Sequence, residues 1–235
     1  MPESRTASHP HSHHLRVQRT ARYYTLGGES GAPKTIWFVL HGYGQLAGQF
    51  VRYFADLADA DTLIVAPEAM NRFYLVSVDK APARERPVGA TWMTREDRES
   101  EIGDYVEYLE ALYEDLAAKN GSESAVAVNV VGFSQGAATA TRWVTNGKAR
   151  IDRLILWGGL LPPEDLDRGK ALRSVPLTLV VGSRDHYVTD DMVANEKARL
   201  DGLGIPYQLV RFEGGHVISR SAFGQLRAAT GASGR

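Results

Sequence analysis

Gly132-Phe133-Ser134-Gln135-Gly136 follows directly after an apolar run at residues 125–131 that reads AVAVNVV. A strand that ends in the pattern G-x-S-x-G and continues into a helix is typical of a nucleophile elbow, a tight turn that holds a serine hydroxyl clear of the sheet. The two glycines are needed because a Cβ atom at either position would collide with the neighbouring strand or helix. The pentapeptide alone is equally consistent with an ordinary turn, so its interpretation depends on residues further along the chain.

Two later residues could activate Ser134. A serine hydroxyl is a poor nucleophile unless a base removes its proton as it attacks. Asp185 lies in a loop just beyond the apolar strand expected at residues 176–181, and His216 follows the last expected strand, after two glycines that let its loop reach back. The order serine, acid, histidine is the one that an elbow of this kind requires. The sequence therefore predicts a triad of Ser134, Asp185 and His216.

Each partner of the serine has a simpler interpretation. A lone histidine such as His216 is often a surface loop residue, and Asp185 could form a turn or cap a helix. Asp190 and Asp191 are rival acids, but they fit better at the N-terminus of the helix expected to follow, where negative charge is favourable. We therefore expect Asp185 to be the acid.

Residues 40–44, Leu-His-Gly-Tyr-Gly, come immediately after the first buried strand. Acyl transfer builds negative charge on the carbonyl oxygen, and two backbone N–H groups aimed at that oxygen can stabilise it. One donor is expected from the residue after the nucleophile, Gln135, and one from this early loop. The loop donor is expected to be Tyr43.

The same loop also matches a nucleotide-binding pattern. Residues 42–47 fit the dinucleotide fingerprint G-x-G-x-x-G/A after a strand, and Glu68 lies ~20 residues further on, where a ribose ligand would be. Pro67 and the irregular segment after Glu68 do not resemble the rest of a nucleotide-binding unit. A nucleotide site would also leave the ordered triad unexplained, so we expect no nucleotide cofactor.

Strands and helices are expected to alternate along the chain, which indicates an α/β fold with a mostly parallel central sheet and helices on both faces, a three-layer sandwich. No clean period is present at residues 67–95, and no linker suggests a second domain. The expected strands are a half-exposed antiparallel one from Arg16 to about Gly28, then residues 35–40, 62–66, 125–131, 151–157, 176–181 and 207–212. The expected helices are one carrying Phe50, Phe54 and Leu57, then residues 102–120, 134–145 and 190–203.

The composition is that of an ordinary globular protein. The chain has 235 residues, of which 43% are hydrophobic and 23% charged, and its formal net charge is −1. This charge gives no reason to expect binding to nucleic acid or to an anionic membrane. The absence of cysteine excludes disulfides, thiolate metal ligands and a cysteine nucleophile. No apolar run approaches the ~18 residues of a membrane span, so we expect no stable membrane insertion.

Residues 1–15 are expected to be a disordered leader before a single domain at residues 16–235. The leader lacks the apolar core of a secretory signal, so a cytoplasmic location is the default. His9, His11, His13 and His14 form a cluster there that either binds a metal adventitiously or belongs to an unstructured tail. We expect these histidines to belong to an unstructured tail, because no acidic partner lies nearby in the sequence. We therefore expect no functional metal site.

Five segments together resemble the phospholipase/carboxylesterase branch of the α/β-hydrolases, the branch that includes bacterial carboxylesterases and acyl-protein thioesterases. The resemblance covers the chain from about Ile36 to His216. It implies a compact α/β-hydrolase with little or no lid that hydrolyses carboxylic esters or thioesters without a cofactor. The matching segments are residues 40–44 (LHGYG), 65–69 (VAPEA), 132–136 (GFSQG), 182–185 (GSRD) and 214–216 (GGH).

The chain departs from the better-known members of that branch at residues 72–98, the region expected to shape the substrate pocket. Phe73, Tyr74, Trp92 and Met93 are the candidate pocket residues. Trp92 and Met93 either line the pocket or pack against the core. Substrate identity therefore does not transfer from the resemblance.

The resulting prediction is a serine carboxylesterase that acts on a small-molecule ester through an acyl-enzyme. A thioesterase or lysophospholipase would use the same site. The alternative from another class is a binding protein that keeps the α/β-hydrolase fold with a vestigial site, because fold alone does not establish activity. Nothing in the sequence indicates the oligomeric state.

Overall fold

The computed structural model describes residues 10–77, 79–120, 126–163 and 170–224. Its strands are β1 (Tyr23–Gly27), β2 (Thr35–Leu40), β3 (Thr62–Pro67), β4 (Asn71–Tyr74), β5 (Val88–Thr91), β6 (Ala127–Phe133), β7 (Arg153–Trp157), β8 (Leu177–Gly182) and β9 (Tyr207–Phe212). Its helices are α1 (Ala47–Phe50), α2 (Arg98–Asn120), α3 (Gln135–Asn146), α4 (Lys170–Ser174) and α5 (Asp190–Gly202), with 3₁₀ helices η1 (Val51–Leu57) and η2 (Ala83–Glu85).

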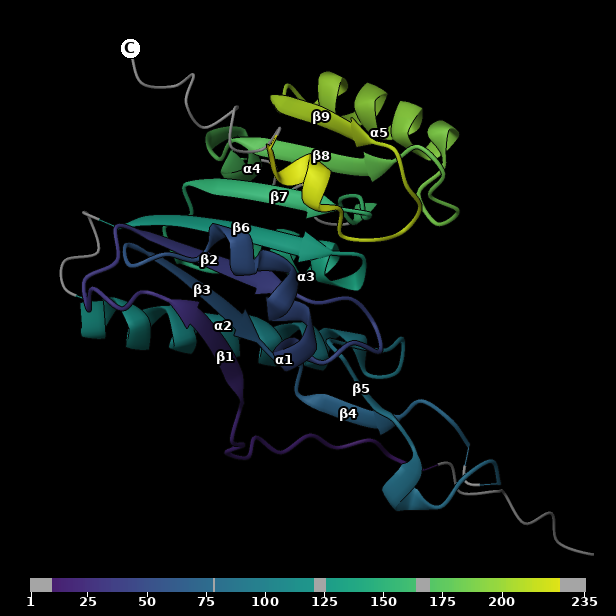
Figure 1. Ribbon diagram of the computed structural model, residues 1–235. Helices are drawn as coiled ribbons and strands as arrows, with labels where there is room; N and C mark the ends of the chain where they lie inside the picture. The colour runs from purple at the N-terminus through teal and green to yellow at the C-terminus, as the bar shows by residue number, and fades with distance from the viewer. Residues whose placement is uncertain (1–9, 78, 121–125, 164–169, 225–235) are drawn as a thin grey trace, which may run out of the picture.

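Within these residues, seven strands form one twisted sheet in the order β1-β3-β2-β6-β7-β8-β9 (Figure 1). β1 runs antiparallel to β3, and every other neighbouring pair is parallel. The carboxyl ends of β2, β6, β8 and β9 therefore lie at the same edge of the sheet. β4 and β5 pair as a separate antiparallel hairpin next to that edge (Figure 1).

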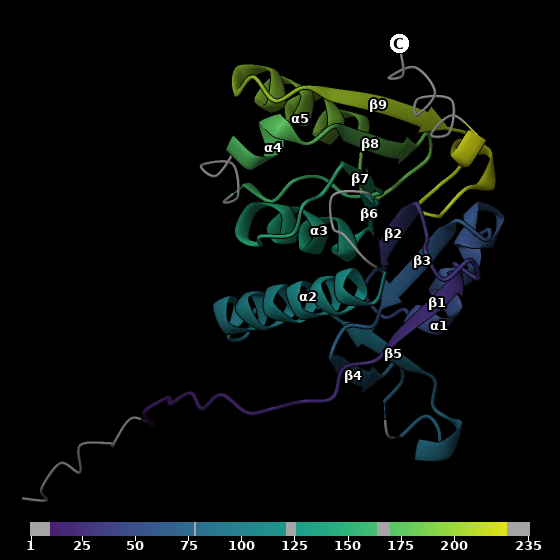
Figure 2. The same ribbon diagram turned by 90° about the vertical axis from the view of Figure 1, so that its left-hand side faces the viewer.

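Helices cover both faces of the sheet. Figure 2 shows α2, α3, α4 and α5 on one face, whereas α1 lies on the other beside β1. The buried residues divide in the same way, with α2 and α3 packing over one face and α1 with η1 over the other. The predicted mostly parallel sheet with helices on both faces is confirmed.

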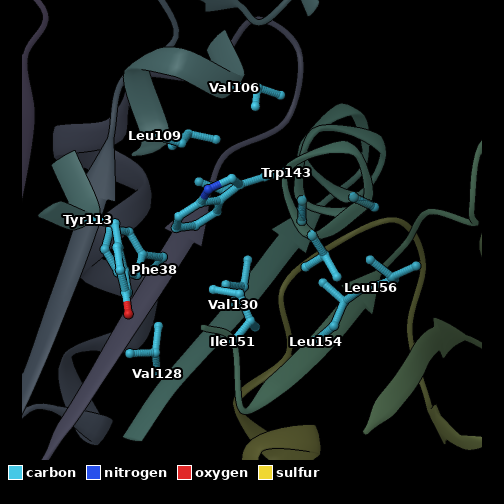
Figure 3. Close-up of a cluster of buried hydrophobic side chains, with 14 of the residues drawn as sticks. Phe38, Val106, Leu109, Tyr113, Val128, Val130, Trp143, Ile151, Leu154 and Leu156 are labelled. Carbon is cyan, nitrogen blue, oxygen red and sulfur yellow. The ribbon is translucent and has the colours of Figure 1, made fainter. Parts of the chain in front are cut away.

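The larger core lies between the sheet and the helices α2 and α3 (Figure 3). Trp143 of α3 is 1% exposed, and its ring meets the edge of Phe38 of β2 with the ring centroids 5.0 Å apart. The indole N–H of Trp143 donates to Glu110 Oε1 at 2.6 Å, so the one polar group of this side chain is paired. This packing holds α3, the helix that follows the elbow, rigidly against the sheet.

Most of the predicted elements lie within one or two residues of their expected ends, but α2 begins at Arg98, four residues before its expected start, and other elements differ more. The first strand begins at Tyr23 rather than Arg16, because its pairing with β3 begins at Tyr23↔Pro67. The apolar residues expected on one helix at 50–57 lie on α1 and the 3₁₀ helix η1. The hairpin β4–β5 and the short helix α4 were not expected.

The expected leader lies partly outside the described residues, since residues 1–9, including His9, are not among them. Of its other histidines, His14 is close to Asp97, with Nε2 and Oδ2 3.0 Å apart. In the part of the chain that the structure describes, no helix is long and apolar enough to cross a membrane.

Candidate active site

Ser134 lies on the sharp turn between β6 and α3. Its backbone has φ 53° and ψ −116°, a conformation that is strained for a residue with a side chain. A Cβ atom at Gly132 would lie 2.2 Å from the carbonyl oxygen of Gly136, and one at Gly136 would lie 2.2 Å from that of Leu40. Only glycine fits at both positions, so the turn has the geometry of a nucleophile elbow.

Asp185 and His216, 31 residues apart in the sequence, meet at the carboxyl edge of the sheet. His216 Nδ1 lies 2.8 Å from Asp185 Oδ2, and the Asp185 side chain is 1% exposed. The other carboxylate oxygen, Oδ1, accepts the backbone N–H groups of Tyr187 at 2.8 Å and Val188 at 3.0 Å. Both oxygens are thus fixed, and one of them is directed at the imidazole.

The two loops that carry these residues are held together by backbone contacts. The N–H of Arg184 donates to the carbonyl of Gly214 at 2.8 Å, and that of Ser183 donates to Phe212 at 2.8 Å. The indole N–H of the buried Trp157 donates to the carbonyl of Val217 at 3.0 Å. The loop of His216 is therefore anchored on both sides of the histidine.

The imidazole of His216 lies next to the elbow. Its ring centroid is 4.9 Å from that of Phe133, the residue before Ser134, and 4.7 Å from that of Tyr187. Tyr187 is 73% exposed, so its ring forms an outer wall over the imidazole. No motif in the sequence indicated a role for this tyrosine.

The rival acids lie elsewhere. Asp190 begins α5 and pairs with Arg211, with Oδ1 and Nη1 2.6 Å apart and its side chain 80% exposed. Asp191 is also exposed in the first turn of α5, whose N-cap is Thr189. The described contacts therefore bring Asp185, and neither rival, to the histidine.

The loop after β2 carries the other expected group, the N–H of Tyr43. On either side of it, the N–H of Gly42 donates to Gln45 Oε1 and that of Gly44 donates to Ala90 O, both at 2.8 Å. Among the described residues, the N–H of Tyr43 has no hydrogen-bond acceptor. Gln135 is the first residue of α3, where backbone N–H groups have no partner within the helix. Both N–H groups are therefore free to bind an oxyanion.

The four candidate pocket residues have different environments. Phe73 lies against Tyr43, with ring centroids 5.1 Å apart, beside the loop after β2. Tyr74 is 47% exposed, and the guanidinium of Arg86 lies 4.1 Å from its ring centroid. Trp92 is 2% exposed and belongs to the core, and Met93 is partly buried against that core. The structure supports the interpretation in which Trp92 packs against the core rather than lining the pocket.

Glu68, which fitted the ribose position of a nucleotide fingerprint, is fully buried and already paired. Its carboxylate binds Arg22 and Arg72 and accepts the backbone N–H of Ala47 at 3.3 Å. Burial alone would raise the pKa of Glu68, but hydrogen bonds from Arg72 and Arg22 outweigh it and lower that pKa. Glu68 thus joins the residue before β1 to β4 and α1, and its oxygens are not available to a ribose.

His41, at the start of the loop after β2, is fully buried with both ring nitrogens bonded. Nδ1 lies 2.8 Å from the carbonyl oxygen of Gly42, so it must donate, and Nε2 accepts the N–H of Ala69 at 3.1 Å. This pairing fixes the neutral tautomer, because a proton on Nε2 would face another donor. Burial lowers the pKa of His41.

The lowered pKa of His41 predicts a loss of stability in mild acid. The unfolded chain binds a proton near pH ~6.5 and the folded chain binds it only at lower pH, so stability is complete above that value and falls below it. For one such group the slope approaches about 1.4 kcal/mol per pH unit. Urea unfolding of the wild type and of His41→Asn at pH 7.5 and 5.5 measures this loss of stability.

We expect the variant to be less stable at pH 7.5 but to lose less stability than the wild type between the two pH values. Equal losses in the two proteins would show that His41 is not the group responsible.

Within the described part of the chain, no group of three or more histidine or acidic side chains is placed to hold a metal ion. The contacts of the Gln135 side chain with residues 91–93, and of the Trp92 indole with His41, were not predicted, because residues 91–93 lie in a segment without a regular pattern.

The model of the phospholipase/carboxylesterase family matches residues 28–230. No curated protein sequence matches the chain.

Solved structures of three kinds share the fold. Esterase PE8 has a TM-score of 0.63 and 24% identity, over 90% of this chain and 98% of its own. Acyl-protein thioesterase 2 of Zea mays has a TM-score of 0.65 and 18% identity, over 91% of this chain and 99% of its own. A carboxylesterase of Mesorhizobium loti has a TM-score of 0.68 and 17% identity, over 90% of this chain and 95% of its own.

Proposed function

Because this chain belongs to the phospholipase/carboxylesterase family and is an ester-hydrolysing α/β-hydrolase, we propose that it is a serine carboxylesterase with the triad Ser134, His216 and Asp185. The observation that carries the proposal is the Asp185–His216 hydrogen bond of 2.8 Å beside the strained serine of the elbow. A buried carboxylate that binds one imidazole nitrogen directs the other nitrogen to act as a base.

In the proposed reaction, Ser134 Oγ attacks the ester carbonyl carbon while its proton moves to His216 Nε2. The carbonyl electron pair moves onto the oxygen, which the N–H groups of Tyr43 and Gln135 bind. Collapse of this intermediate expels the alcohol, which takes the proton from His216, and leaves an acyl-enzyme. Water then attacks with His216 again as base, and the acid leaves. Asp185 holds the imidazole in place and stabilises its cation.

A fluorophosphonate probe tests this proposal directly. We expect one phosphonyl adduct per chain, located on Ser134 by peptide mapping, because the proposed triad gives this hydroxyl a base, His216, that takes its proton. Ser134→Ala should give no adduct. An adduct on another residue of the wild type, or none, would remove the serine-hydrolase mechanism and favour a vestigial site.

The substrate is expected to carry a short to medium acyl chain. Tyr43 and Phe73 form a small aromatic surface beside the proposed oxyanion loop, and Leu75 Cδ2 lies near Gly44 of the same loop. Each methylene buried there would add about 0.8 kcal/mol to binding, or roughly fourfold in kcat/KM. We expect kcat/KM to rise with acyl length and to stop rising before roughly ten carbons.

A series of p-nitrophenyl esters and matching acyl thioesters measures this preference and separates ester from thioester specificity. Phe73→Ala should flatten the rise, whereas Tyr74→Ala, an exposed ring on the same strand, should not. A rise that continues past roughly ten carbons, or a profile unchanged by Phe73→Ala, would contradict this account of the pocket.

A further inference from the structure

Residues 89–93, which include the end of β5, contact the loop that carries Tyr43. The N–H of Gly44 donates to Ala90 O at 2.8 Å, and the N–H of Ala90 donates to Gln45 O at 3.2 Å. A Cβ atom at Gly89 would lie 2.4 Å from Gly44 O, so the two backbones touch. These contacts leave the loop little room to move on this side.

The indole of Trp92 adds a contact at the start of the same loop. Its Nε1–H donates to His41 O at 2.8 Å, and its ring lies 5.2 Å from the imidazole of His41 between centroids. Trp92 is 2% exposed, so water does not compete for this carbonyl. The loop is thus bonded to residues 89–93 at both of its ends.

The same segment binds the side chain of Gln135, which begins α3. Gln135 Oε1 accepts the backbone N–H of Trp92 at 3.0 Å, and Nε2 donates to Met93 O at 2.8 Å. The hydroxyl of Thr91, a residue 4% exposed, lies 3.0 Å from Nε2. The amide therefore has partners at both of its polar atoms, and all of them belong to residues 91–93.

We propose that the side-chain amide of Gln135 is a positioning group, which together with the indole N–H of Trp92 fixes the spacing of the two oxyanion donors. The donors lie on separate elements, the N–H of Tyr43 on the loop after β2 and the N–H of Gln135 on α3. Residues 89–93 join these elements. The inference rests on the proposed function, because the spacing has a role only if the two N–H groups bind an oxyanion.

Positioning of the two donors affects the transition state more than the bound substrate. A donor is effective only at 2.7–3.1 Å from the place that the oxyanion will occupy, and the field of a preorganised dipole falls as that distance grows. The ground-state ester has no such charge. A small displacement of one donor should therefore lower kcat while leaving KM almost unchanged.

Gln135→Met tests the inference, because it keeps the backbone N–H and the chain length and removes both polar atoms of the side chain. We expect kcat to fall roughly 10- to 100-fold, less than the ~10²- to 10³-fold loss of a whole donor, with KM within about threefold. The second readout is the inhibition constant Ki of an alkyl trifluoromethyl ketone. Ser134 Oγ bonds to its carbonyl carbon while the hydroxyl proton moves to His216, and the carbonyl electron pair moves to the oxygen, which then occupies the oxyanion site. Its Ki should rise by the factor by which kcat/KM falls.

Gln208→Met on β9 is the matched control, since Gln208 is exposed on the edge strand of the seven-stranded sheet, whereas β5 belongs to the separate two-stranded sheet. It should leave kcat and Ki unchanged. Trp92→Phe, which keeps a ring in the core and removes the indole donor, should show the same parallel change in kcat/KM and Ki as Gln135→Met.

The inference is overturned if Gln135→Met keeps kcat within about threefold of the wild type, or if kcat falls without a matching rise in Ki. Failure of the proposed function has another signature. In that case the wild type itself is neither phosphonylated on Ser134 nor inhibited by the ketone.

Discussion

Ser134→Ala and His216→Ala are each expected to lower kcat by about 10³- to 10⁶-fold, because the members of a triad act as a unit. Without Oγ no acyl-enzyme forms, and without the imidazole nothing takes the serine proton as attack begins. The double variant should be no worse than either single variant, since each change alone removes the whole covalent route. Initial rates on a p-nitrophenyl ester, corrected for uncatalysed hydrolysis, measure all three proteins.

Ser174→Ala and His14→Ala are suitable controls for this experiment. Both side chains are exposed, Ser174 on α4 and His14 beside Asp97, and neither contacts the residues of the site. Both variants should keep wild-type turnover. Multiplicative losses in the double variant would show that Ser134 and His216 act independently, which contradicts the proposed mechanism.

The sheet and the position of its loops were predictable from the sequence because parallel strands covered on both faces are nearly continuous apolar runs. β2 occupies the expected residues 35–40, and β9 occupies 207–212. Once the strands are parallel, polar residues that directly follow them must gather at one edge. This geometry is why the sequence predicts that Ser134, Asp185 and His216 lie at one edge of the sheet, and the structure joins Asp185 to His216 by a contact of 2.8 Å.

The region between β3 and α2 was not predictable in the same way. β4 and β5 are four residues each, too short for an alternating pattern to distinguish a strand from a loop. Their positions depend on contacts with distant residues, such as the hydrogen bond from Trp92 to His41, 51 residues earlier. A periodicity argument carries no information about such contacts.

Glu68 shows the same limit for a motif. Its spacing from the loop at residues 42–47 fitted a ribose ligand, but its carboxylate is bound by Arg22, 46 residues upstream, and by Arg72. Sequence spacing describes where a side chain occurs along the chain, but the residues that bind this side chain depend on the fold. The order of the residues in the proposed triad is a stronger signal, because it is tied to the order of the strands.

Asp185→Asn is expected to lower kcat by about 10³- to 10⁴-fold while leaving the free energy of unfolding nearly unchanged, and the orientation of the carboxylate gives the reason. Oδ1 accepts two backbone N–H groups, from Tyr187 and Val188. An asparagine would keep its carbonyl oxygen there and turn its NH₂ group toward His216 Nδ1. That nitrogen must then accept, so the proton of the neutral imidazole moves to Nε2, which can no longer remove the proton of Ser134.

Asp190→Asn is the matched control for this substitution, with the same change of group at the start of α5. It removes an exposed pair with Arg211, a change of about 0–1 kcal/mol in stability, and should leave kcat unaffected. Asp191→Asn should behave in the same way. Steady-state kinetics and urea unfolding of the three variants decide the assignment. If Asp190→Asn or Asp191→Asn abolishes turnover and Asp185→Asn does not, the acid lies later in the loop, and the Asp185–His216 hydrogen bond of 2.8 Å has only a structural role.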